Sequence, residues 1–128
     1  AKTMNERREA GRQYLRENLG EAYLEKRDAS TNEFNAPLRA LSEEYAFGEV
    51  WSRPGLDRKI RSMLCLAMLT ALNRPHEIRI HVNSAINNGC TLSEIREVLL
   101  QTSLYCGLPA AIDSHAVAEE VLRERGML

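Results

Sequence analysis

The sequence has little of what several common protein classes require. Its 128 residues include three cysteines, none of them in a Cys-x-x-Cys pair or a Cys/His cluster, so the pattern predicts neither a disulfide framework nor a zinc site. Aromatic residues make up 5% of the chain, and the formal net charge is -1 with both signs spread along it. Without a basic patch, we expect no binding to nucleic acid or to an anionic membrane surface.

Long hydrophobic runs are also missing. The longest apolar stretch, 63–69, is far shorter than the roughly 20 residues that span a bilayer. The first residues are polar and lack the apolar core of a signal peptide. No cofactor-binding motif is visible, so we expect no cofactor and no metal. These features predict a soluble, cytoplasmic protein with reduced thiols, folded as one domain over residues 1–128.

The N-terminal residues predict a polar helical arm. Residues 5–19 are rich in Glu, Arg, Ala and Leu, which favour helix, and Gly20 is expected to end that helix. The apolar stripe on it is thin and consists of Tyr14, Leu15 and Leu19. We therefore expect residues 1–30 to form an arm on the outside of the domain.

A second helix is predicted from Asn35 to about Phe47. Asn is a good N-cap, and the proline that follows suits the first turn. Its apolar stripe, which has the spacing of a core-facing helix, consists of Leu38, Leu41 and Tyr45. Residues 48–56 are predicted to be a loop, because Pro54 disfavours helical geometry at Arg53.

The next helix is predicted from the cap Asp57 to Leu72, and its second half is apolar on every side. Such a helix must be buried on all faces, which is difficult within one subunit of 128 residues. We therefore expect other copies of the chain to cover part of it.

Three more helices follow, with clear start and stop signals. One spans Pro75 to about Asn88 before Gly89, and the next opens with the capping box of Thr91 and Glu94. A break at 107–109 leads into a last helix over 110–125. Strand-type alternation is absent, so the sequence predicts an all-α bundle of about six helices.

Two groups of residues could carry chemistry. Arg74, Glu77 and His81 recur at spacings of three and four, so they share one edge of a helix. A carboxylate one turn from an imidazole can transfer a proton, although the same spacing is common in solvated surface pairs. His81 borders apolar positions of the same helix, and this favours partial burial and the catalytic interpretation.

The loop contributes the second group, Glu49, Trp51 and Arg53. A guanidinium beside a rigid Pro-Gly turn is suited to a bidentate grip on a carboxylate, or to an ion pair with a neighbouring acid. The indole of Trp51 could equally plug the bundle or line a pocket. The three cysteines have no nearby cation or helix start, which favours packing over nucleophilic roles.

These residues resemble the γ-carboxymuconolactone decarboxylase family over nearly the whole chain. The specific segment is the W-S-R-P-G-L-D-R stretch at 51–58, followed by His81, N-N-G at 87–89, E-I-R-E-V-L-L-Q at 94–101 and Y-C-G-L-P-A-A at 105–111. The wider superfamily includes alkylhydroperoxidase AhpD-type proteins, which carry Cys-x-x-Cys and a His on one helix. Arg74, Glu77 and His81 hold the corresponding positions here, so only the His is retained.

The resemblance implies an AhpD-like fold assembled as a ring-like homo-oligomer, most simply a hexamer. It also implies a cofactor-free lyase of the β-ketoadipate pathway that converts 4-carboxymuconolactone to β-ketoadipate enol-lactone and CO2. His81 would deliver a proton or stabilise the oxyanion, and Glu77 or Glu49 would orient its ring. Arg53 would bind a substrate carboxylate, helped by Arg74, and Trp51 would line the pocket.

One segment departs from the family pattern, because residues 112–115 read Ile-Asp-Ser-His where an Asn is common. If this segment lines the pocket, the chain acts on a related lactone or acid. Two other functions stay open, an AhpD-like peroxidase and a non-enzymatic oligomer. The missing Cys-x-x-Cys argues against the first, and the intact loop with His81 argues against the second.

Overall fold

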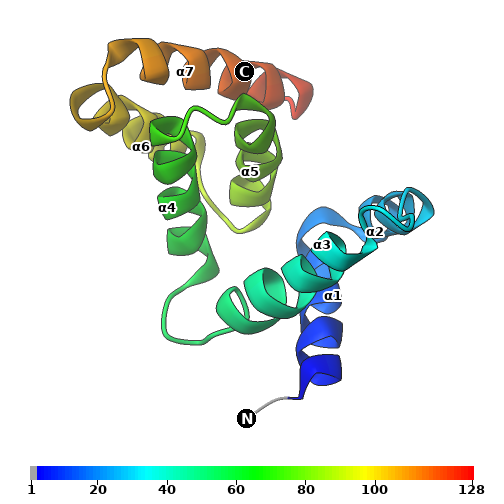
Figure 1. Ribbon diagram of the computed structural model, residues 1–128. Helices are drawn as coiled ribbons and strands as arrows, with labels where there is room; N and C mark the ends of the chain where they lie inside the picture. Colours follow the sequence, from blue (N-terminus) through cyan, green and yellow to red (C-terminus); the bar gives the residue numbers. More distant parts are fainter. Residues whose placement is uncertain (1–2) are drawn as a thin grey trace. The chain divides into compact units, whose positions relative to one another are not determined.

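The computed structural model describes residues 3–128, and every regular element in that range is helical (Figure 1). The elements are α1 (Met4–Leu19), α2 (Glu21–Ala29), α3 (Ala36–Leu41), the π-helix η1 (Ser42–Val50), α4 (Arg58–Ala71), α5 (Pro75–Asn87), α6 (Leu92–Tyr105) and α7 (Leu108–Glu124). The all-α prediction is confirmed, with α2 as an element that the sequence analysis missed. No helix within residues 3–128 has the length and apolar character needed to cross a membrane.

The chain forms two compact units, unit 1 over Ala1–Leu56 and unit 2 over Asp57–Leu128. The predicted arm over residues 1–30 therefore folds together with the residues up to 56, and its residues 1–2 lie outside the described part. Two residues of its apolar stripe, Tyr14 and Leu15, are among the most enclosed side chains of the molecule, and Leu19 is half-buried. The Tyr14 ring stacks on Phe47 at 5.6 Å and lies 5.2 Å from Trp51.

Two glycines allow α1 to pack directly against η1. A Cβ atom added at Gly11 would lie 1.9 Å from the carbonyl oxygen of Glu43, and one added at Gly48 would lie 2.0 Å from that of Arg7. Neither contact leaves room for a side chain, since the obstacle is backbone. The sequence therefore encodes a crossing at which the two helix backbones touch.

The prediction for the second helix is wrong in two respects. The helix continues past Gly48 to Val50, and its second half is a π-helix. Leu38, Leu41 and Tyr45, expected to face the core, are exposed. The buried face instead carries Gly48 and the carboxylate of Glu43, because these are the positions that α1 covers.

Glu43 is a charged residue in the interior of unit 1, with a side chain that is 2% exposed. Three arginines compensate it: Arg27 at 2.5 Å, Arg12 at 3.2 Å and Arg8 at 3.3 Å. Arg12 also forms a bidentate pair with Asp28 at 2.7 and 3.0 Å. Buried charges persist only when they are paired and hydrogen-bonded, so this cluster ties α1 and α2 to η1.

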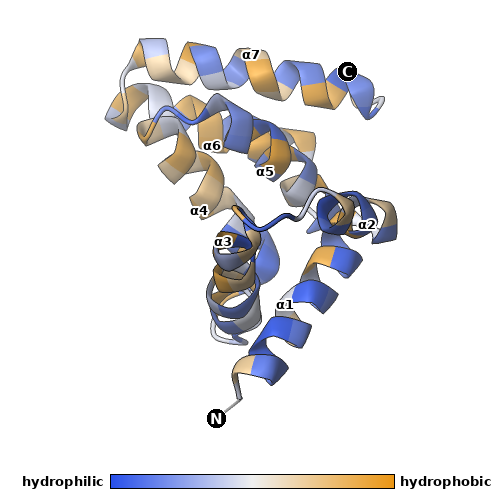
Figure 2. Cartoon of the chain, turned by 45° about the vertical axis from the view of Figure 1, so that its right-hand side comes forward, coloured by the Kyte–Doolittle hydropathy of each residue, from blue (hydrophilic) through white to orange (hydrophobic). Residues whose placement is uncertain are grey.

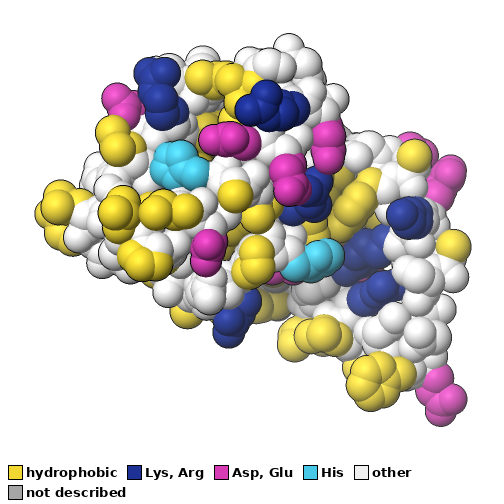
Figure 3. Space-filling model, turned by 90° about the horizontal axis from the view of Figure 1, so that it is seen from above, with side chains coloured by type: hydrophobic (Ala, Val, Ile, Leu, Met, Phe, Trp, Pro, Cys, Tyr) yellow, Lys and Arg dark blue, Asp and Glu magenta, His cyan; other side chains and the backbone are white. Residues whose placement is uncertain are grey.

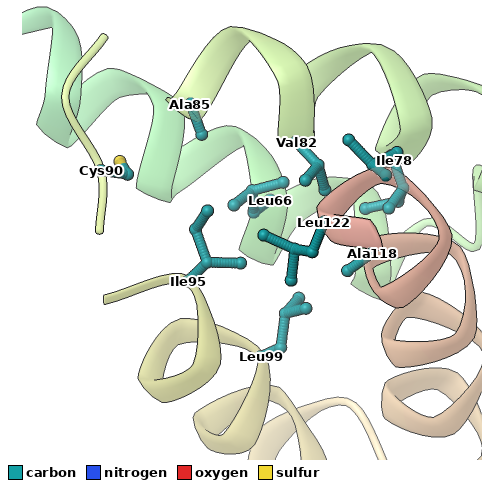
Figure 4. Close-up of a cluster of buried hydrophobic side chains, with 10 residues drawn as sticks. Leu66, Ile78, Val82, Ala85, Cys90, Ile95, Leu99, Ala118 and Leu122 are labelled. Carbon is teal, nitrogen blue, oxygen red and sulfur yellow. The ribbon is translucent and has the colours of Figure 1, made fainter. Parts of the chain in front are cut away.

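Unit 2 has its own hydrophobic core between α4, α5, α6 and α7 (Figure 4). The side chains that meet there include Leu66, Val82, Ile95, Leu99 and Leu122. The helix boundaries follow the predicted caps. Asp57 accepts a hydrogen bond from the Lys59 amide at 2.8 Å, and Thr91 and Glu94 form the expected capping box. The last helix begins at Leu108 rather than Ala110, since Pro109 fits its first turn.

The two faces of α4 differ in environment. One face is fully buried by the other helices of unit 2 through Ser62, Leu66 and Thr70. The other presents the exposed side chains Ile60, Leu64, Met68 and Leu72. Hydrophobic colour accordingly continues along α4 in Figure 2, whereas α1 is hydrophilic over most of its visible surface. The exposed face of α4 is therefore not covered by the other helices of unit 2.

Candidate active site

The imidazole of His81 lies beside the carboxylate of Glu77 on α5. His81 Nε2 is 3.9 Å from Glu77 Oε2, and the His81 side chain is 15% exposed against 48% for Glu77. The helix places them one turn apart, and the neighbouring Ile78 and Val82 enter the core of unit 2. This confirms the partial burial expected for His81. The pair has one enclosed member and one that solvent can reach.

Burial sets the protonation state of His81. Removal from water lowers the pKa of the imidazole below its ordinary value of 6.5, and the negative charge of Glu77 offsets only part of that effect. At pH 7 the ring is therefore mainly neutral, with one N–H donor and one lone pair. A neutral imidazole can donate a hydrogen bond to a developing oxyanion, and a bound anion would favour its protonation.

Arg74 does not share the environment of this pair. It is the N-cap residue of α5, and its Nη1 atom donates to the backbone carbonyl of Leu72 at 2.9 Å. The guanidinium is thus directed to the end of the preceding helix rather than along α5. The shared edge predicted from sequence spacing holds for Glu77 and His81, whereas the side chain of Arg74 turns back along the chain.

The loop residues belong to unit 1. Trp51 is buried and its ring lies 5.2 Å from that of Tyr14, a contact that favours the plug over the pocket wall. Arg53 is 63% exposed, with its Nη1 atom 3.4 Å from Glu49 Oε1. The other oxygen of Glu49, Oε2, lies 3.4 Å from Nε of Arg7 on α1. The guanidinium of Arg53 is thus paired with Glu49 and largely exposed to solvent.

Two of the three thiols, Cys65 and Cys90, are harder to ionise than a free cysteine. Burial raises the pKa of Cys65, and burial together with the charge of Glu94 raises that of Cys90. Cys106 lines an apolar groove of about 430 Å³ between α4 and α6, together with Leu64 and Val98. A thiol that is harder to ionise is a weaker nucleophile, so the environment of Cys65 and Cys90 favours the packing role.

The segment that departs from the family pattern lies in the first half of α7. Ser114 is buried and shares a hydrogen bond of 2.9 Å with Thr70 of α4. His115 bonds through Nδ1 to the carbonyl of Ala111 at 2.7 Å, and Asp113 is exposed. Ser114 therefore serves the packing of α7 on α4.

Sequence reasoning missed two sets of charged residues. Neither the arginines around Glu43 nor the contact of Arg7 with Glu49 follows from local spacing, since the partners come from different helices. The signal that could have found them is the glycine inside each helix, Gly11 and Gly48, which marks close backbone packing. Among the described residues there is no group of three or more His, Cys, Asp or Glu that could hold a metal ion.

Comparison with known proteins gives a consistent result. The profile of the Carboxymuconolactone decarboxylase family matches residues 36–120. A 4-carboxymuconolactone decarboxylase of Acinetobacter baylyi is 40% identical over 122 residues, which is 95% of this chain and 91% of that protein. The nitrosuccinic acid decarboxylase npaB of Metarhizium robertsii is 40% identical over 106 residues, covering 83% of this chain and 74% of that protein.

Proposed function

The chain belongs to the carboxymuconolactone decarboxylase family, and on this basis we propose that it is a carboxy-lyase that converts 4-carboxymuconolactone to β-ketoadipate enol-lactone and CO2. The observation that carries the proposal is the 40% identity to a protein of that name over 95% of this chain. The enclosed imidazole of His81 beside Glu77 supplies a group suited to the chemistry.

The substrate itself provides the electron sink. When the bond between the ring carbon and the carboxylate breaks, CO2 leaves and the electron pair passes through the conjugated system to the carbonyl oxygen of the lactone. The resulting dienolate then takes up one proton at carbon. A protein that catalyses this reaction needs a group to hold the substrate, a donor for the oxyanion and a route for the proton, and no step demands a cofactor.

The residues of this chain fit these tasks as follows. His81 in its neutral form donates a hydrogen bond to the dienolate oxygen, and the proton that the carbon takes up comes from solvent water. The sequence leaves Glu77 and Glu49 as alternative partners for the ring. The separation of 3.9 Å supports Glu77, whereas Glu49 contacts two arginines of unit 1.

Substrate binding is assigned to Arg53, whose exposed guanidinium can take a carboxylate in bidentate fashion. Trp51 supports the start of the loop that carries Arg53, through its contact with Tyr14. Arg74 would add positive charge at the beginning of α5, on the helix that carries His81.

The direct test is to mix purified protein with 4-carboxymuconolactone, without added metal or nicotinamide, and to follow loss of the lactone by ultraviolet absorbance and release of CO2. Nitrosuccinic acid is the comparison substrate, because its nitro group can accept the electrons left by CO2. Peroxide with a dithiol donor tests the AhpD-like alternative. Turnover of the lactone supports the proposal, whereas peroxide reduction alone would replace it.

The Arg53→Lys variant separates charge from geometry. Lysine keeps the positive charge but loses the planar fork, so KM for 4-carboxymuconolactone should rise nearly as much as in Arg53→Ala if the contact is bidentate. Steady-state kinetics of the two variants measure the difference. An unchanged KM in Arg53→Lys would assign Arg53 to the fold or to another partner.

We also propose that the protein is a homo-oligomer, most simply a hexamer, built as a single-domain subunit and located in the cytoplasm. The support for assembly is the uncovered face of α4, with Leu64, Met68 and Leu72 exposed. The space-filling view adds hydrophobic side chains gathered toward the left, the side on which α6 and the start of α7 lie (Figure 3). Exposed apolar patches of this kind mark interaction surfaces.

Replacing Leu64 with glutamate should break up the assembly. The side chain is 47% exposed in the isolated chain, so a carboxylate there is tolerated by the subunit but not by an apolar interface. Light scattering at micromolar concentration should show a lower mass for Leu64→Glu than for wild type. Leu64→Met keeps the apolar surface and should keep the wild-type mass. A monomeric wild-type protein would refute the proposed assembly.

A further inference from the structure

Glu49 connects two arginines that lie in different parts of unit 1. Its Oε2 atom is 3.4 Å from Nε of Arg7 on α1, and its Oε1 atom is 3.4 Å from Nη1 of Arg53 in the loop after η1. Each carboxylate oxygen therefore faces a different guanidinium. The three side chains form a continuous ion-pair chain from α1 to the residue proposed to hold the substrate.

The backbone fixes the first contact of this chain. Gly48 precedes Glu49, and a Cβ atom at Gly48 would lie 2.0 Å from the carbonyl oxygen of Arg7. The main chains of α1 and η1 touch at this point, so the positions of Arg7 and Glu49 relative to each other are set by helix packing. Arg7 Nε makes no hydrogen bond to Glu49, so the guanidinium restrains the Glu49 carboxylate through the attraction of opposite charges at 3.4 Å.

The second contact controls a more mobile group. Arg53 is 63% exposed and follows the last turn of η1, so its long side chain has many rotamers in water. A carboxylate in a fixed place reduces that freedom before the substrate binds. Binding then costs less conformational entropy, which is how a preorganised side chain gains affinity.

We propose that Arg7 is a positioning residue for the substrate-binding guanidinium of Arg53, and that it acts through Glu49. The inference rests on the role proposed above for Arg53. It gives Glu49 a function in binding rather than in proton transfer. Arg7 itself does not touch the substrate.

The first experiment compares Arg7→Gln with Arg16→Gln. Arg16 is also on α1 and forms its own ion pair, with Glu21 at 2.6 Å, so it is a matched control. Exposed ion pairs contribute little energy, so Arg7→Gln should raise KM for 4-carboxymuconolactone by about two- to fivefold with kcat unchanged. Arg16→Gln should leave both constants as they are. A fall in kcat, or an equal rise of KM in both variants, would overturn the proposal.

The second experiment tests whether the effect passes through Glu49. In the Glu49→Gln background, where KM is already raised, Arg7→Gln should add no further increase, because the link to Arg53 is broken. If Arg7→Gln raises KM by the same factor in both backgrounds, its charge acts through space or through the fold. That result would refute the relay.

A third measurement does not depend on activity. The order parameter of the Arg53 Nε–H bond, from 15N relaxation, should fall in Arg7→Gln and stay at the wild-type value in Arg16→Gln. If the wild-type protein does not decarboxylate the lactone but the order parameter falls as expected, the proposed function fails and the positioning contact stands. An unchanged order parameter in Arg7→Gln overturns the positioning role, whatever the activity.

Discussion

Replacing His81 with alanine should lower kcat/KM for 4-carboxymuconolactone by about 10²–10⁴, which corresponds to roughly 3–5 kcal/mol of lost transition-state stabilisation. The expectation follows from the position of the imidazole, which is 15% exposed and has the carboxylate of Glu77 at 3.9 Å. A donor in an enclosed site is worth far more than one in water, because water does not compete with it. Steady-state kinetics should show this reduction in kcat/KM, and light scattering should show that the assembly is intact.

The pH dependence of the wild-type protein tests the role of the ring. Burial lowers the pKa of His81 below 6.5, so the neutral form is the resting state at pH 7. If the neutral imidazole is the catalytically active form, kcat/KM should fall as the pH drops through that lowered pKa. In His81→Gln this fall of kcat/KM at low pH should vanish, while the glutamine amide retains part of the activity. A rise of kcat/KM as the pH drops through this pKa would instead assign His81 to proton delivery as the imidazolium.

Glu77→Gln serves as the companion variant. If Glu77 only orients the ring, this change should cost less activity than His81→Ala and should lower the imidazole pKa further, because a negative charge that raises it is removed. The acid limb of kcat/KM should then move to lower pH. Wild-type kcat/KM in His81→Ala would refute the assignment of the site to this pair.

The helices of unit 2 could be predicted because their signals are local. Asp57 and Thr91 cap helices through side chains within three residues of the amides they bind, and Gly89 follows the end of α5 with a φ of 97°. The adjacency of Glu77 and His81 is equally local, since it depends only on the helical repeat. These features could be predicted because the residues that determine them lie within about one helical turn of each other in the sequence.

Unit 1 could not be predicted in the same way because its causes are tertiary. In the π-helix η1 the buried face is the one with Gly48, because α1 packs against that glycine. Burial of Glu43 depends on arginines from α1 and α2, far away in sequence. A pattern of polar and apolar residues places a glutamate on the surface by default. The pattern therefore predicts that Leu38, Leu41 and Tyr45 face the core, which is wrong.

The Glu43→Gln variant should lose about 3 kcal/mol of stability in unit 1. The amide has the same shape but cannot balance the guanidiniums of Arg27 and Arg12, which are largely buried beside it. Breaking a buried ion pair costs about 3–5 kcal/mol, and the partial exposure of Arg8 favours the lower end. Urea unfolding can be followed by the fluorescence of Trp51, the single tryptophan, which is buried in unit 1.

The pH dependence of the stability difference between wild type and Glu43→Gln tests whether the charge of Glu43 causes it. Burial by itself would raise the pKa of Glu43, but the hydrogen bonds from Arg27, Arg12 and Arg8 lower it below its ordinary value of 4.5. The unfolded chain therefore takes up the proton first, and the stability that Glu43 contributes should be complete above pH 4.5 and decline as the pH falls toward the lower folded pKa. The unfolding midpoints of wild type and Glu43→Gln should approach each other over that range.

Glu44→Gln, which removes the neighbouring charge on η1, is the control and should follow wild type throughout. Equal midpoints for Glu43→Gln and Glu44→Gln at pH 7 would show that the arginine cluster does not stabilise unit 1.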